Sequence, residues 1–223
     1  MEKISIYLLR HGRQNSRLCN VNVPLDESGK CQAELAGKRL KQYGIGIVYS
    51  SDLIRAVETA EIMNKYLSVE HICLSGLREI DFGCLTGLTD SEIKKRYASF
   101  LEERDKYESD IPFPSDEGSP NGENGAKVYK RAKEAIDIIL ERCMKENIES
   151  AAVVSHGGTI RSLLAGILDM PQEHRLLFAK TMENTGITQI DYHINKKKFY
   201  VERINDYSHL ENHPELLRKN FKS

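Results

Sequence analysis

The chain has 223 residues, of which 40% are hydrophobic, and a formal net charge of −1. This length allows one good-sized buried core, and the near-neutral charge gives no reason to expect nucleic acid or a membrane surface as a partner. No stretch approaches the roughly 20 apolar residues that span a bilayer, and we expect no signal peptide. The five cysteines are scattered and lack a Cys-x-x-Cys pair, which favours reduced thiols in a cytoplasmic protein over a disulfide framework or a zinc site.

The first predicted element is a buried strand over residues 4–9, which runs into the charged turn Arg10-His11-Gly12. Burying an unpaired guanidinium is costly, so we expect an anion to meet Arg10 at the end of this strand. The like charge of Arg10 disfavours the cationic form of His11, which keeps the imidazole neutral and nucleophilic. An ordinary strand-to-helix turn with surface charges would explain the triplet equally well.

Helices and strands alternate in the next segments. Asp26 to Gly29 has the composition of a helix start, and apolar residues at helical spacing follow it until Gly44. Residues 47–50 form a second predicted strand, after which Ser51 or Asp52 can cap another helix.

Two charged residues of the first half stand where a ligand would suit them. Arg55 falls in the first turn of its predicted helix, where the helix dipole disfavours a cation unless an anion is bound. Glu79 follows a third predicted strand over residues 71–74 and precedes a glycine-rich turn. The plain alternatives are an exposed surface arginine and a solvated loop carboxylate.

The middle of the chain is predicted to be a cap inserted at about residues 90–125 of a single domain that covers 1–223. Residues 90–108 are heavily charged and helical in pattern, whereas residues 111–123 are too rich in proline and glycine for regular structure. Such a long connection in a compact domain is commonly an active-site lid or a disordered loop. An amphipathic helix resumes over residues 126–144.

The last third repeats the opening pattern. A buried strand over residues 151–155 is followed by His156 and Gly157-Gly158, which turn into a helix over 159–168. A helix start reached through glycines presents free N–H groups and suits a phosphate. The carboxyl ends of parallel strands share one edge of a sheet, so both His-Gly turns should meet there. Strands 187–194 and 199–204 then form a predicted hairpin at the sheet edge.

These residues together indicate phosphoryl chemistry. Arginine forks match phosphate oxygens bidentately, which favours a phosphate over a carboxylate or a sugar. The sequence contains no Gly-x-x-x-x-Gly-Lys phosphate loop, no clustered aspartates for a metal and no Gly-x-Ser-x-Gly elbow. His11 is therefore the best-placed nucleophile, and Glu79 is the available general acid for the leaving alkoxide and then the base toward water. A nearby phosphate dianion would favour the protonated form of Glu79.

The sequence resembles the histidine phosphatase, or phosphoglycerate mutase-like, superfamily from about residue 4 to residue 210. The resemblance implies a doubly wound, mostly parallel α/β sheet with helices on both faces, an antiparallel edge strand, and no metal or cofactor. It also implies that Arg10, Arg55 and His156 bind phosphate, that His11 is phosphorylated and that Glu79 donates the proton. Five motifs in the family's order carry it: Leu9-Arg10-His11-Gly12; Pro24-Leu25 with Gly29; Ser50 to Leu53 with Arg55-Ala56 and Thr59-Ala60; Leu77-Arg78-Glu79 with Phe82-Gly83 and Gly87; and Ser155 to Gly158.

The chain departs from the family pattern in the loop after His11. Gln14 stands where members often carry Thr or Ser, and Arg17 stands where they often carry Asn. We expect Asn15 or Gln14 to supply the missing phosphate contact, beside Gly157 at the other turn. Two further segments are similar to the phosphatase branch rather than to a glycolytic mutase: Gly122-Glu123-Asn124 with Arg131, and Asn205 to Leu210.

The sequence thus predicts a metal-independent enzyme of the histidine acid phosphatase type, which hydrolyses a phosphomonoester through a phosphohistidine. The alternatives are phosphoglycerate mutase or sugar-bisphosphatase activity, and a module that binds a phosphorylated ligand without catalysis. The expected partner is a small phosphorylated metabolite, with neither nucleic acid nor a membrane involved. The oligomeric state stays open, with a homodimer among the options.

Overall fold

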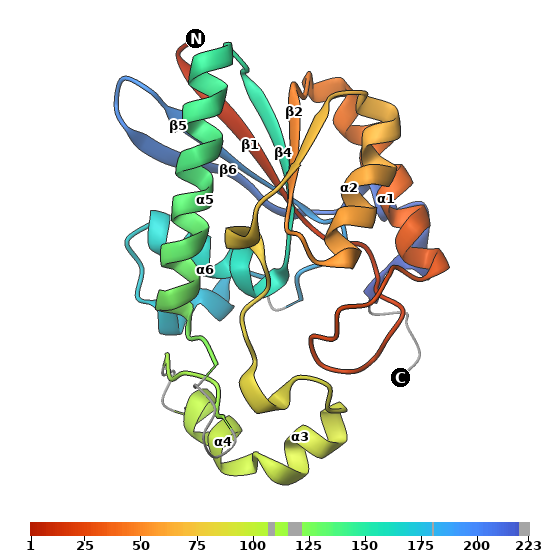
Figure 1. Ribbon diagram of the computed structural model, residues 1–223, viewed down its shortest axis with the longest axis vertical. Helices are drawn as coiled ribbons and strands as arrows, with labels where there is room; N and C mark the ends of the chain where they lie inside the picture. Colours follow the sequence, from red (N-terminus) through yellow and green to blue (C-terminus); the bar gives the residue numbers. More distant parts are fainter. Residues whose placement is uncertain (107–109, 116–121, 180, 219–223) are drawn as a thin grey trace.

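The computed structural model places a mixed six-stranded sheet between two groups of helices (Figure 1). It describes residues 1–106, 110–115, 122–179 and 181–218. The strand order is β3-β2-β4-β1-β5-β6, in which the first four strands run parallel while β5 and β6 form an antiparallel hairpin at one edge. The predicted fold class is confirmed. The strands are β1 (Lys3–Arg10), β2 (Ile47–Ser50), β3 (Glu70–Cys73), β4 (Ser150–Ser155), β5 (Ile187–His193) and β6 (Lys198–Asp206).

Helices cover both faces of the sheet, and β1 shows how the sequence specifies this. Ile4, Ile6 and Leu8 pack with residues of α5 (Gly125–Glu146) and α6 (Gly157–Ile167), whereas Tyr7 and Leu9 pack with residues of α1 (Glu27–Leu40) and α2 (Ile54–Leu67). Successive side chains of a strand point to opposite faces, so an unbroken apolar run suits a strand covered on both sides. Within the described part of the chain, none of the helices has the length and apolar character required to cross a bilayer.

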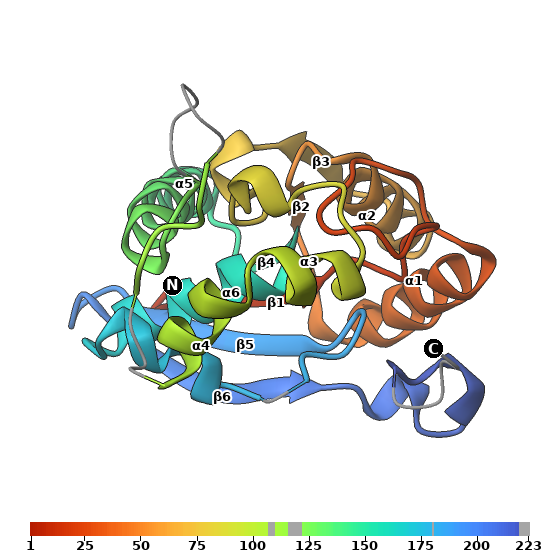
Figure 2. The ribbon, with the colours of Figure 1, turned by 90° about the horizontal axis from the view of Figure 1, so that it is seen from below.

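The predicted cap region forms two short helices beyond the carboxyl ends of the parallel strands. They are α3 (Asp90–Arg96) and α4 (Ala98–Lys106), and Figure 2 shows them in front of the sheet when the molecule is seen from that end. Thr89 and Glu92 form a reciprocal capping box that starts α3. The rings of Phe82 and Phe100 pack against Phe113, with centroids 4.7 and 5.5 Å away. Residues 107–109 and 116–121 of the predicted cap lie outside the described residues.

The predicted cap of α2 is wrong. Neither Ser51 nor Asp52 caps the helix, because its N-cap position is Leu53, which makes no side-chain cap hydrogen bond. Instead, Oδ1 of Asn22 accepts a hydrogen bond from the backbone N–H of Ile54 at 2.9 Å. The loop between β1 and α1 thus satisfies the first turn of α2 from a distance in sequence, which local spacing does not reveal.

Candidate active site

The pairing of β1 with β4 brings the two His-Gly turns together. Arg10 is the register partner of Ser155, and the backbone N–H of His11 donates to the carbonyl oxygen of Ser155 at 2.9 Å. The two strands therefore end level with each other, and the next residue of each is a histidine. The ring centroids of His11 and His156 lie 5.0 Å apart.

Gly12 allows two backbone segments to approach each other closely. A Cβ atom at this position would lie 2.6 Å from the carbonyl oxygen of Gly29, near the start of α1. Any larger residue would push β1 and α1 apart and would displace His11 with them.

The hydrogen bonds of His11 define its tautomer. Nδ1 lies 2.7 Å from the carbonyl oxygen of Gly12, which can only accept, so Nδ1 carries the proton. Nε2 accepts a hydrogen bond from Nε of Arg55 at 3.2 Å. Burial, followed by the charges of Arg10 and Arg55, holds the pKa of His11 well below its usual value. The result is a neutral imidazole with an unprotonated Nε2, whose lone pair becomes available for attack once Arg55 gives up this hydrogen bond.

His156 is fully buried and has no such anchoring. Neither of its ring nitrogens has a hydrogen-bond partner among the described residues. Burial and the neighbouring His11, Arg55 and Arg10 hold its pKa well below the usual value, so the ring is neutral. Buried polar groups without partners are costly, and a phosphate oxygen would accept from the ring's N–H.

Arg10 and Arg55 bring two guanidinium groups to His11, and neither forms an ion pair with the described residues. Nη1 of Arg10 donates to the carbonyl oxygen of Met182 at 2.6 Å, while its buried Nε has no partner there. Nη2 of Arg55 donates to Oδ1 of Asn20 at 2.9 Å. These acceptors are uncharged, so neither guanidinium has a charged hydrogen-bond partner among the described residues, although the nearby charge of Glu79 partly offsets both. An anion that accepts their hydrogen bonds would compensate the remaining positive charge.

Glu79 reaches the same edge of the sheet from the loop after β3. Its Oε1 accepts from the backbone N–H of Ile80 at 2.9 Å, and its Oε2 lies 3.4 Å from the backbone nitrogen of Gly158 in the first turn of α6. A Cβ atom at Gly158 would stand 2.5 Å from Oε1 of Glu79. Gly158 therefore leaves the space in which this carboxyl group lies.

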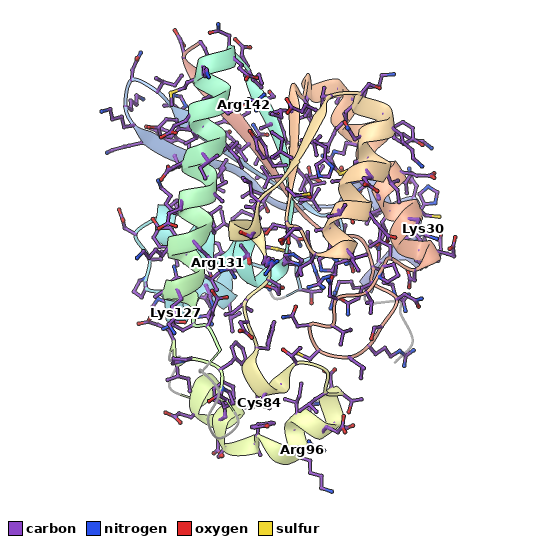
Figure 3. All side chains as sticks on the ribbon, in the orientation of Figure 1. Lys30, Cys84, Arg96, Lys127, Arg131 and Arg142 are labelled. Carbon is purple, nitrogen blue, oxygen red and sulfur yellow. The ribbon has the colours of Figure 1, made fainter. Side chains whose placement is uncertain are left out.

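Arg131 of α5 fixes the backbone that carries Glu79. It donates to the carbonyl oxygens of Gly76, Arg78 and Glu79 at 2.7 to 3.0 Å, and it forms two 2.7 Å contacts with the carboxylate of Glu123. Figure 3 shows Arg131 and Arg142 toward opposite ends of the same helix. The resemblance singled out Glu123 and Arg131 by position, and the structure shows what they hold.

A cavity of about 710 Å³ opens over these groups. His11, Arg10, Arg55 and Glu79 all line it, whereas His156 does not. Of the two residues expected to contact phosphate in the loop after His11, Gln14 lines the cavity, whereas Asn15 is exposed and does not line it. The loop also contributes Arg13, Ser16, Arg17, Cys19 and Asn20.

Gly157, the other predicted phosphate contact, lies beside Arg10. A Cβ atom built on it would be 3.8 Å from Nε of Arg10. It borders a second, smaller cavity rather than the larger one.

Three residues of the site were not predicted to belong to it. Asn184 is buried, lines the cavity and donates from Nδ2 to the carbonyl oxygen of His11 at 2.8 Å. Asn20 binds Arg55, and the hydroxyl of Thr59 accepts from the N–H of Gly12 at 2.9 Å. Thr59 could have been found by its spacing, since it lies one helical turn after Arg55.

The described residues contain no group of three or more His, Cys, Asp or Glu side chains arranged to hold a metal ion.

Comparison with known proteins identifies similar chains along nearly the whole length. The family model of the histidine phosphatase superfamily (branch 1) matches residues 6–207. A broad-specificity phosphatase of Saccharomyces cerevisiae is 28% identical over 220 residues, which cover 93% of this chain and 87% of that protein. A probable phosphoglycerate mutase, GpmB of Salmonella arizonae, is 29% identical over 219 residues, which cover 93% of this chain and 95% of that protein. The solved structure of Bacillus stearothermophilus YhfR superposes with a TM-score of 0.80 at 29% identity, covering 93% of this chain and all of that one (100%).

Proposed function

Because the chain belongs to the histidine phosphatase superfamily, we propose that it hydrolyses small phosphomonoesters through a phosphohistidine formed on His11. The observation that carries this proposal is the state of His11 Nε2. This atom is unprotonated, belongs to a buried ring that lines the large cavity, and lies 3.2 Å from Nε of Arg55.

In the first step the phosphate of the substrate accepts hydrogen bonds from the arginine and histidine side chains of the site. Nε of Arg10 and a ring N–H of His156 can donate to this phosphate without breaking an existing hydrogen bond, because neither has a partner among the described residues. Arg55 shifts its Nε–H from His11 to a phosphate oxygen, which frees the lone pair of Nε2. Nε2 then attacks phosphorus in line, the P–N bond forms and the ester P–O bond breaks. Glu79 gives its proton to the departing oxygen.

In the second step water releases the phosphate. Glu79, now a carboxylate, takes a proton from water, whose oxygen attacks phosphorus as the P–N bond breaks. Throughout, the hydrogen bond from Nδ1 to the carbonyl oxygen of Gly12 disperses the charge on the phosphorylated ring. The proton of Nδ1 never leaves, so the imidazole returns to its starting tautomer.

We further propose that the enzyme is an acid phosphatase and that it acts in the cytoplasm. The first is supported by the lowered pKa values of both histidines, which keep the rings neutral below the ordinary value for histidine. The second is supported by the five free thiols. The phosphorylated metabolite would bind in the cavity, without a nucleic acid or a membrane as partner.

Trapping the intermediate tests the proposal. A labelled aryl phosphate is mixed with the enzyme in the presence of a chelator and quenched with base, which preserves phosphohistidine. We expect turnover and a label on the peptide that contains His11, in a form that acid removes. Turnover that the chelator abolishes, or a label on another residue, would contradict the proposed mechanism.

Phosphoglycerate mutase activity is the second candidate, favoured by the 29% identity to the probable mutase GpmB. It requires the phosphohistidine to pass its phosphoryl group to a second hydroxyl rather than to water. Product analysis with 3-phosphoglycerate decides between the two: a mutase yields 2-phosphoglycerate, whereas a phosphatase yields glycerate and inorganic phosphate.

A further inference from the structure

Thr59 of α2 lines neither of the two cavities and takes no part in the steps proposed above. Its side chain is fully buried, so it cannot touch the substrate. Its hydroxyl group nevertheless makes two hydrogen bonds inside the site. Oγ1 lies 2.9 Å from the backbone nitrogen of Gly12 and 2.6 Å from the carbonyl oxygen of Arg55.

The direction of both hydrogen bonds follows from their partners. The carbonyl oxygen of Arg55 can only accept, so the single hydroxyl proton of Thr59 points to it, and a lone pair of Oγ1 accepts from the N–H of Gly12. The first bond lies within α2, where a threonine can reach the carbonyl group four residues earlier. The second joins α2 to the turn after β1. Thr59 therefore connects Gly12 to Arg55 through one oxygen atom.

These two residues are also the ones that bind the ring of His11. The carbonyl oxygen of Gly12 accepts from Nδ1 at 2.7 Å, and Nε of Arg55 donates to Nε2 at 3.2 Å. A neutral imidazole can carry its proton on either nitrogen, and the partner of each nitrogen decides which one. Both bonds favour the proton on Nδ1. This is the tautomer whose Nε2 can attack phosphorus.

Gly12 needs support from other residues to keep its carbonyl group in place, because glycine has wide backbone freedom. Side chains hold the peptide groups on both sides of it. Nδ2 of Asn184 donates to the carbonyl oxygen of the peptide group before Gly12 at 2.8 Å, and Thr59 binds the N–H of that same group. Oε1 of the buried Gln32 accepts from the N–H of the peptide group after Gly12 at 2.9 Å. These contacts fix the orientation of the carbonyl group that binds Nδ1.

We propose that Thr59 is a positioning residue that keeps His11 in the tautomer required for attack. This inference rests on the proposed phosphatase function. Without the hydroxyl group, the N–H of Gly12 lacks its buried acceptor, and the turn rotates to find another one because such a group is costly to leave unpaired. The carbonyl oxygen of Gly12 then moves away from Nδ1. A fraction of the rings carries its proton on Nε2, and such a ring cannot form the P–N bond.

A pair of substitutions separates the hydroxyl group from the rest of the side chain. Thr59→Val keeps the shape and removes the hydroxyl group, whereas Thr59→Ser keeps the hydroxyl group. We expect Thr59→Val to lower kcat toward an aryl phosphate by about tenfold, the size of one hydrogen bond, with KM changed by less than about threefold because the phosphate ligands stay in place. Thr59→Ser should keep kcat within about threefold of the wild type.

Nitrogen NMR of the isotope-labelled His11 ring at neutral pH shows the tautomer directly and needs no turnover. In the wild type we expect one protonated nitrogen, Nδ1, and one unprotonated nitrogen, Nε2. In Thr59→Val both signals should move toward intermediate values, because the two tautomers exchange. Thr59→Ala also lacks the hydroxyl group and should give the same shift, so it replaces Thr59→Val if that variant does not fold.

Thr188→Val is the matched control. Thr188 is also buried, and its Oγ1 accepts from the backbone N–H of Asn205 at 3.1 Å, but it lines neither cavity and has no printed contact with His11. Its substitution should lower the free energy of unfolding in urea without changing kcat or the ring signals of His11. A merely structural role of Thr59 predicts the same result for Thr59→Val.

Ring signals that stay as in the wild type when the hydroxyl group of Thr59 is removed would overturn the proposal. An equal loss of kcat in Thr59→Val and Thr188→Val would overturn it as well. Absence of turnover and of phosphoenzyme in the wild type would instead contradict the phosphatase function itself, and the ring signals would still report whether Thr59 sets the tautomer.

Discussion

The two His-Gly turns of this protein end neighbouring strands, yet they hold their rings in opposite ways. Nδ1 of His11 is bound to its own turn and Nε2 to Arg55. The ring centroid of His156 lies 5.0 Å from that of His11, and neither nitrogen of the His156 ring has a hydrogen-bond partner among the described residues. A nucleophile has to be oriented before substrate arrives, whereas a ligand for phosphate has to keep its donor free. The difference in hydrogen bonding therefore gives a physical basis for two roles at turns that share the same His-Gly pattern.

Replacing the oriented ring tests the comparison most strongly. We expect His11→Ala to lose about 10⁴-fold or more in kcat toward an aryl phosphate, because no other group can form the covalent intermediate. The labelled phosphoenzyme should disappear as well. The partly exposed His213, which does not line the cavity, offers a control, since His213→Ala should retain full activity. Substantial turnover by His11→Ala would remove the distinction between the two turns.

Replacing the unbonded ring should have a smaller effect of a different kind. We expect His156→Ala to lower kcat/KM by about 10²- to 10³-fold, the cost of losing one donor to the transition state. The phosphoenzyme should still form on His11, only more slowly, in rapid-quench measurements. If His156 carried the label and His11 did not, the two roles would have been assigned the wrong way round.

The orientation of Glu79 relative to both rings depends on Arg131. We expect Arg131→Gln to lower kcat by about tenfold, because Glu79 loses its fixed backbone, and to lower the free energy of unfolding by about 2 kcal/mol, because Glu123 and three carbonyl oxygens lose their donor. Activity assays and urea denaturation measure the two effects. On the same helix, Arg142→Gln removes only partly exposed ion pairs with Glu70 and Glu146 and should change neither quantity. Equal effects of the two substitutions would show that Arg131 has no special role.

Titration tests a property that the two turns share. The pKa values of His11 and His156 are both lowered by burial and by neighbouring cationic or imidazole groups. Both rings thus stay neutral below the ordinary value of about 6.5, and kcat/KM of the free enzyme should change by less than about threefold between pH 7 and pH 6. The unfolded chain binds more protons in acid, so stability should decrease as the pH falls below about 6.5. A steep loss of kcat/KM that begins at the ordinary histidine pKa would contradict this expectation.

Much of the fold follows from local patterns in the chain. The apolar runs of β1 and β4 and the helical spacing in α1 and α5 depend on neighbours in sequence, so their positions could be predicted closely. The start of α2 could not, because its first N–H group is satisfied by Asn22 from a separate loop. The helical pattern of residues 90–108 likewise did not show the break at Tyr97 that separates α3 from α4.

The site shows the same division. His11, Arg55 and Glu79 stand at strand or helix ends and line one cavity, as the shared edge of a parallel sheet requires. Asn184 and Arg218 belong to segments without a local pattern, and they reach the cavity only because β5 pairs with β1 and Glu183 holds the C-terminal segment. Of the two residues expected to contact phosphate in the loop after His11, Gln14 lines the cavity and Asn15 is exposed, a difference that the sequence does not show because the direction of a loop side chain is not set by its neighbours.

The central position of β1 also bears on how the protein acquires activity. β1 lies between β4 and β5, both of which follow it in the chain by well over a hundred residues. Contacts between segments so far apart form slowly, because the entropy of closing the intervening loop has to be overcome first. During synthesis His11 therefore leaves the ribosome long before the strands that position it. In refolding, we expect helical structure to return early and catalytic turnover to lag behind it.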